Sequence, residues 1–344
     1  MNVGLARAAA AEWVKEHASR ADGYCGAYFS GSTIILADDA ELPASSDVDV
    51  VVVTEQAEPP IKLGKLFYRG TLLEITYLSW NEIASVEVVL TSYHLAGSFR
   101  TNTIIDDPTG HLRSLQAEVS RHFAERDWVR RRCANARIKI ENGLRSIDAS
   151  APLHDQVMSW LFPTGVTTHV LLVAALRNPT VRLRYLAARS ALTDYGHADL
   201  YPELLKLLGC DQLSPQRVEQ HLGELARTFD AAAAAARTPF FFSTDITAAA
   251  RPIAIDGSRE LIQSGSHREA VFWIVATFAR CHKILAADAP PELQRTLLPA
   301  FEAMIADLGI TSAGDLTGRA EQVIRFLPVL WETAEAIMAD SCQP

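Results

Sequence analysis

Two aspartates, Asp47 and Asp49, alternate with valines at positions 48 and 50–53, and this short segment constrains the fold more than any other. β-Branched residues favour a pleated surface, so the run predicts a strand that is covered on both faces. Residues two apart in a strand point to the same face, which places the two carboxylates side by side. Buried carboxylates cost free energy unless a cation meets them. The pattern therefore predicts a site for a hard divalent cation such as Mg2+.

A third carboxylate, Glu74, interrupts the next apolar segment, residues 72–77. If this segment forms a strand beside the first one, Glu74 joins Asp47 and Asp49. Three acids can hold two Mg2+ ions about 3.5–4 Å apart, an arrangement that promotes in-line displacement at phosphorus. Glu74 can also accept the proton of an attacking hydroxyl. We therefore expect all three acids to be both metal ligands and catalytic residues.

A glycine between serines, Ser30-Gly31-Ser32, precedes the acids and predicts a phosphate-binding turn. Glycine lets the backbone approach a phosphate closely. One or two helical turns expected over residues 33–37 would supply unpaired amide donors and the positive end of a dipole. The hydroxyls of Ser32 and Ser46 are expected to donate to the same phosphates.

Hydrophobic periodicity divides the chain into two parts. The first part has helical spacing over residues 3–18 and four short predicted strands, at 24–30, 47–54, 65–69 and 71–78. A turn cluster at 106–110 ends it. Beyond this cluster the pattern predicts helices over 111–148, 152–176, 180–194, 214–236, 267–287, 291–307 and 318–340. The expected fold class is α+β, with a catalytic α/β head and small mixed sheet over residues 1–110 and an all-helical substrate-binding domain over 111–344.

Composition narrows the possible partners and compartment. The net charge of −9 disfavours long-range attraction to nucleic acid. No uninterrupted apolar run approaches the roughly 20 residues that a bilayer requires. The N-terminus lacks a basic region followed by an apolar stretch, so no signal peptide is expected. The five scattered cysteines fit a reducing compartment, and we expect a soluble cytoplasmic protein without membrane or nucleic-acid partners.

The order of these motifs resembles the nucleotidyltransferase superfamily of DNA polymerase beta. An α/β head followed by helices is most similar to its small-molecule antibiotic members, such as the kanamycin and streptomycin enzymes. The resemblance covers Ser30 to about Leu78, and residues 104–112 are similar to the family's link to the next helix. The spacer between Ser32 and Asp47 is longer than in the antibiotic enzymes, and the arginine that often follows the Gly-Ser pair is absent.

The resemblance implies a Mg2+-dependent transfer of a nucleoside monophosphate, usually AMP from ATP, to a hydroxyl, with pyrophosphate leaving. It implies that Gly31 and Ser32 bind the triphosphate, that Asp47 and Asp49 bind metal, and that Glu74 is the third acid and base. Transfer to an aminoglycoside-like antibiotic would make the protein an antibiotic-resistance enzyme.

The helical domain is expected to offer cations to the triphosphate. Arg182 and Arg189 lie about two turns apart on one predicted helix face, with Arg184 offset from them, and we select Arg182 as the nucleotide-binding residue. Ser266 and Glu269 have the spacing of a capping box, and His267 and Arg268 beside them are weaker candidates for substrate contacts. The basic run at 130–132 suggests RNA at first sight, but basic residues on helices mostly face solvent or pair with acids.

The sequence therefore predicts an adenylyltransferase-like enzyme that uses ATP, or another nucleoside triphosphate, and a small-molecule hydroxyl. Two alternatives stay open. One is the same chemistry directed at a protein or RNA hydroxyl, as in the antitoxin-like members of the superfamily. The other is a nucleotide-binding protein without catalytic activity.

Overall fold

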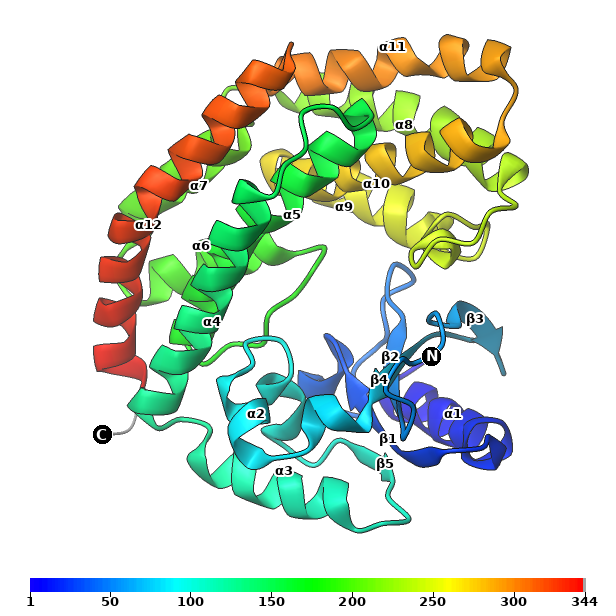
Figure 1. The fold of residues 1–344 in the computed structure, drawn as a ribbon, viewed down its shortest axis with the longest axis vertical. Coiled ribbons are helices and arrows are strands. Elements are labelled where there is room, and N and C mark those ends of the chain that lie inside the picture. Colours follow the sequence, from blue (N-terminus) through cyan, green and yellow to red (C-terminus); the bar gives the residue numbers. More distant parts are fainter. Residues whose placement is uncertain (343–344) are drawn as a thin grey trace.

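The structure is a computed structural model that describes residues 1–342. It is an α+β protein, with a small mixed sheet in its N-terminal part and a mostly helical C-terminal part. Figure 1 shows the sheet at the lower right and the helical part arching over it.

The sheet has five strands in the order β3-β4-β2-β1-β5. Their bounds are β1 Tyr24–Ser30, β2 Val48–Thr54, β3 Gly64–Tyr68, β4 Thr71–Ser79 and β5 Ile104–Asp106. Only β2 and β4 pair in parallel; the other neighbours are antiparallel. The first four strands lie where the sequence predicts them. The sequence predicts only part of a link at the fifth strand, because three residues are too few to show an alternating pattern.

Helices cover both faces of the sheet, which explains the unbroken valine run of β2. Helix α1 (Val3–Glu16) packs on one face against Val48, Val50 and Val52. On the other face, α2 (Val86–Thr91) and α3 (His111–His122) share a core with the sheet. Leu112, Leu115 and Val119 of α3 belong to that core, so the packing of the head continues past residue 110.

The helical part consists of α4 to α12. Their bounds are α4 Arg126–Arg145, α5 Leu153–Ala174, α6 Arg184–Asp194, α7 Tyr201–Leu208, α8 Pro215–Ala235, α9 Gly257–Gln263, α10 His267–Asp288, α11 Pro291–Asp307 and α12 Ala313–Ser341. The predicted segment 111–148 is two helices, and the segment predicted from residue 318 begins at Ala313. Helices α7 and α9 were missed because each spans only two turns or so.

Helices α5 and α10 are long and apolar enough to cross a membrane by length and composition. In the structure they form the centre of the helical core and are mostly buried, 78% and 83% over their most apolar windows. Core helices of this kind pass the same test, so they are weak evidence for membrane insertion. All five cysteines, including Cys342 at the end of the described chain, are free thiols.

Candidate functional site

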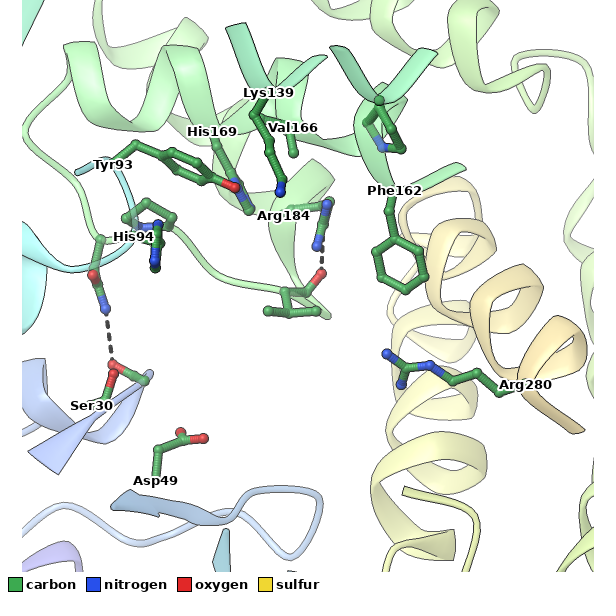
Figure 2. A pocket seen from close by; sticks show the side chains of 16 residues that line it. Ser30, Asp49, Tyr93, His94, Lys139, Phe162, Val166, His169, Arg184 and Arg280 are labelled. Carbon is green, nitrogen blue, oxygen red and sulfur yellow. Dashed lines mark hydrogen bonds between the residues drawn. The ribbon is translucent and has the colours of Figure 1, made fainter. Parts of the chain in front are cut away.

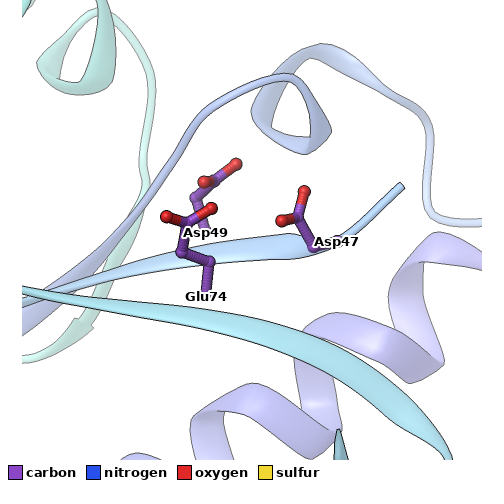
Figure 3. A group of neighbouring side chains, drawn as sticks. All are labelled: Asp47, Asp49 and Glu74. Atoms are coloured by element: carbon purple, nitrogen blue, oxygen red, sulfur yellow. The ribbon is translucent and has the colours of Figure 1, made fainter. Parts of the chain in front are cut away.

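The three predicted acids converge. Parallel pairing of β2 with β4 places Asp49 directly beside Glu74, and Asp47 precedes β2 by one residue. One carboxylate oxygen from each of the three residues lies within 4.8 Å of the others. Figure 3 shows the three side chains on the same side of the two strands. This donor set suits a hard divalent cation.

Two lysines enter this acid cluster. The Nζ of Lys65, on β3, lies 2.6 Å from Asp47 Oδ2 and also bonds Glu74 Oε2. The Nζ of Lys62 lies 2.6 Å from the other oxygen of Glu74, Oε1. Both ammonium groups lie 3.5 Å from the carboxylate of Asp245, in the helical part. Sequence reasoning missed these three residues.

A signal for Lys65 was present in the sequence. Arg69 and Gly70 form a two-residue turn, with φ of 47° and 77°, as in the type I′ turn that suits a β-hairpin. Counting outwards from that turn pairs Lys65 with Glu74, and the structure has this register. Directly opposed residues share a face of the sheet, so their side chains meet.

Burial and charge together set the pKa values of the cluster. Burial raises the pKa of Asp49 well above its usual range, and the neighbouring Asp47 and Glu74 carboxylates raise it further. Burial also raises the pKa of Asp47, and the Lys65 ammonium only partly offsets that effect. For Glu74 the opposite holds: burial is outweighed by Lys65 and Lys62, which lower its pKa to about 2. Asp49 is therefore the acid that most needs a further cation.

The Gly-Ser turn closes directly over Asp49. Gly31 has φ +69°, and a Cβ at this position would lie 1.7 Å from Asp49 Oδ2. No residue with a side chain fits there without moving the carboxylate. Asn178 Nδ2, from the segment before α6, donates to the carbonyl of Gly31 at 3.0 Å. The glycine turn therefore packs directly against the acid cluster.

The serines of this region differ in position. Ser30 lines the cavity described below, and its Oγ lies 2.9 Å from Ser98 Oγ. Ser32 is exposed and Ser46 is half-buried, and neither lines that cavity. The helix expected after Gly31 is a single 3-10 turn over Thr33–Ile35. The expected helix dipole is wrong, since three residues do not build one.

A cavity of about 630 Å³ lies between the head and the helical part. Ser30, Gly31 and Asp49 line it, as do Tyr93 and His94 of the loop after α2, and residues of α4, α5, α6, α10 and the segment before α6 form the rest (Figure 2). Most of the surface of its wall is apolar, and Tyr93, Phe162 and Val166 contribute to it. Clefts between domains of this size commonly bind small molecules.

The cavity is basic. Lys139, Arg184 and Arg280 line it, and Asp49 is the only carboxylate among the lining residues. The Arg184 guanidinium stacks over Phe272, 3.9 Å from the ring centroid. Burial lowers the pKa of Arg184 to about 10, which still leaves it charged at neutral pH. His169 also lines the cavity and stays neutral, because burial, assisted by Arg184, lowers its pKa to about 3.

The predicted arginine, Arg182, does not line this cavity. It precedes α6. Its guanidinium donates to the carbonyl of Ser45 at 3.3 Å and interacts electrostatically with the Asp47 carboxylate. Arg189, on its expected face, instead binds Glu269. Arg184 lines the cavity instead. Helix α6 begins at Arg184, so Arg182 lies before the helix and the predicted helix face shared by Arg182 and Arg189 does not exist.

Most of the remaining candidates have structural partners. Ser266 makes no capping bond, so the predicted capping box is wrong; Glu269 accepts from Arg189 and from the Tyr201 hydroxyl. His267 and Arg268 do not line the cavity. In the basic run, Arg130 pairs with Glu335, Arg131 with Glu87, and the buried Arg132 donates to two backbone carbonyls.

No family model matches the chain, and no curated protein sequence matches it. The function must therefore be inferred from the chemistry of the site.

Proposed function

We propose that the protein is a Mg2+-dependent nucleotidyltransferase that moves a nucleoside monophosphate, AMP if ATP is the donor, to a hydroxyl of a small molecule. One observation carries the proposal. The carboxylates of two parallel strands converge beneath a glycine turn at the edge of a basic cavity. Metal-binding acids, a turn that admits phosphate and a set of cations are the parts that phosphoryl transfer requires.

The donor set fits Mg2+. Asp49 has no ion-pair partner within the described residues, and only one oxygen of Asp47 is bonded to a lysine. These two carboxylates would hold the ion, which when bound neutralises phosphate charge and polarises the phosphorus centre. The order of the motifs along the chain, which resembles the DNA polymerase beta superfamily, supports the same chemistry and the corresponding nucleotidyltransferase fold for the head.

We assign the cavity to the nucleotide. A triphosphate is strongly anionic, and Lys139, Arg184 and Arg280 offer it three cations. Tyr93 and Phe162 supply aromatic surface on which a base can stack. An aminoglycoside is a polycation and would be repelled by the same three groups, so an antibiotic acceptor of that class would have to bind outside this cavity.

In the proposed reaction the acceptor oxygen attacks the α-phosphorus in line, and the bond from that phosphorus to the pyrophosphate oxygen breaks. The hydroxyl proton passes to a base. Glu74 becomes an effective base only when Lys62 or Lys65 moves away from it, because the two ammonium groups outweigh burial and lower its pKa to about 2. The residues therefore bind and orient the substrates first, and proton removal follows a rearrangement within the cluster.

The test is thermal denaturation of the full chain with ATP, with and without Mg2+. Ligand that binds only the folded state raises the midpoint by mass action. We expect a Mg2+-dependent shift that Asp47→Ala and Asp49→Ala each abolish and that Asp39→Ala, an exposed acid of the same head, leaves intact. An unchanged shift in both site variants would contradict the proposal. Incubation with ATP, Mg2+ and a panel of small-molecule, protein and RNA acceptors then identifies the acceptor class.

One observation favours a second candidate, a nucleotide-binding protein without activity: both oxygens of Glu74 are occupied by lysines. Measurable ATP binding without pyrophosphate release for every acceptor would identify the protein as this kind.

A further inference from the structure

The acid cluster already contains a cation at its centre. The Lys65 side chain is only 6% exposed, and its Nζ contacts the carboxylates of Asp47 and Glu74 and lies 3.5 Å from that of Asp245. Lys65 thus bridges the first and third acids of the cluster, which is where a second metal ion would be expected if three acids held two ions.

The position of Lys65 is fixed by elements on both sides. Pairing of β3 with β4 places it opposite Glu74. The start of β3 packs on the 3-10 turn Ser243–Asp245 of the helical part, and a Cβ at Gly64 would lie 1.7 Å from Thr244 Oγ1. The Nη1 of Arg280 in turn donates to Asp245 Oδ2 at 3.0 Å. The ammonium is therefore part of the packing between the head and the helical part.

The charges of the cluster leave room for one divalent ion. Three of the four carboxylates, those of Asp47, Glu74 and Asp245, are in ion pairs with Lys62, Lys65 or Arg280. The uncompensated negative charge falls on Asp49, which has no ion-pair partner among residues 1–342 and borders the cavity. An ion held by all three acids would lie beside the Lys65 ammonium and be repelled by it, because a divalent cation doubles the repulsion between two unit charges.

We propose that Lys65 is a fixed cation that takes the place of one of the two metal ions, so that the site binds a single divalent ion through Asp47 and Asp49. This inference rests on the proposed function and specifies its metal requirement. Lys65 then stabilises the negative charge of Glu74 and of the acceptor oxygen, and the bound ion neutralises the charge of the nucleotide phosphates.

The experiment counts bound Mn2+ by electron paramagnetic resonance on the full chain, at saturating Mn2+ and α,β-methylene-ATP, a non-reactive analogue. We expect one Mn2+ per chain in the wild type and in Lys65→Arg, which keeps the positive charge. We expect two in Lys65→Met, because loss of the ammonium frees Asp47 and Glu74. Lys206→Met, on the surface of α7, is the matched control and should bind one.

Two Mn2+ ions in the wild type would overturn the inference, since Lys65 would then yield to metal, while leaving the proposed function intact. One ion in a folded Lys65→Met variant would overturn it as well. No nucleotide-dependent Mn2+ in the wild type would refute the proposed function itself. The wild-type count decides even if Lys65→Met fails to fold, and Lys65→Gln provides a polar variant of similar length.

Discussion

Replacement of Gly31 by alanine tests the packing of the glycine turn against the acid cluster. At φ +69° an alanine is strained by about 1–2 kcal/mol. Its Cβ would also lie 1.7 Å from Asp49 Oδ2, so Asp49 must leave its rotamer or the turn must shift. Moving that buried carboxylate adds roughly 1 kcal/mol or more. We expect Gly31→Ala to lose about 2–4 kcal/mol of unfolding free energy.

Gly196 offers a matched control. Its φ is +74°, but nothing lies within 4 Å of the position that a Cβ would take, so Gly196→Ala carries the backbone strain alone. Urea denaturation of both variants measures the difference, which isolates the contact with Asp49. The second readout is the Mg2+-dependent thermal shift with ATP, which we expect Gly31→Ala to lose and Gly196→Ala to keep. Equal stability losses together with a retained shift in Gly31→Ala would refute the reasoning.

Two further predictions concern the cavity and the helical core. Arg184→Met should weaken ATP binding at least about tenfold, since a hydrogen bond to a charged group is worth about 1.5–3 kcal/mol. Arg189→Met should leave the affinity unchanged, because the Arg189 guanidinium binds Glu269. Calorimetric titration compares the two variants, and equal affinities for ATP would show that Arg184 does not belong to the nucleotide site. Burial, with a smaller effect of His154, lowers the pKa of His282 to about 4. Between that value and the unfolded value of about 6.5 the unfolded chain binds more protons, so stability falls with falling pH by up to about 3 kcal/mol. The His282 ring is stacked on Phe301, and His282→Phe should reduce this loss of stability at acid pH. The measurement is the urea midpoint at pH 7.5 and at pH 5, and an equal fall in the wild type and the variant would contradict the prediction.

Local sequence patterns determined the strands and the long helices. The valine run around Asp49 predicts a strand covered on both faces, and α1 and α2 cover it. The two-residue spacing of Asp47 and Asp49 and the lone acid in the next apolar segment predict their convergence, because strand periodicity and pairing of neighbouring segments are short-range properties. Gly31 was predicted as a turn, although its contact with Asp49 was not.

Tertiary packing decided which cations meet the site. Arg182 and Arg184 are two residues apart, and only the start of α6 at Arg184 determines that Arg184 faces the cavity. Asp245 and Arg280 lie far from Glu74 in the sequence, and no spacing rule predicts that they meet the acid cluster. A side chain's face within an element follows from local periodicity, but its partners in another element follow from how the elements pack. The acids and the pairing of Lys65 with Glu74 could therefore be predicted from the sequence, whereas the charges that the helical part contributes required the fold.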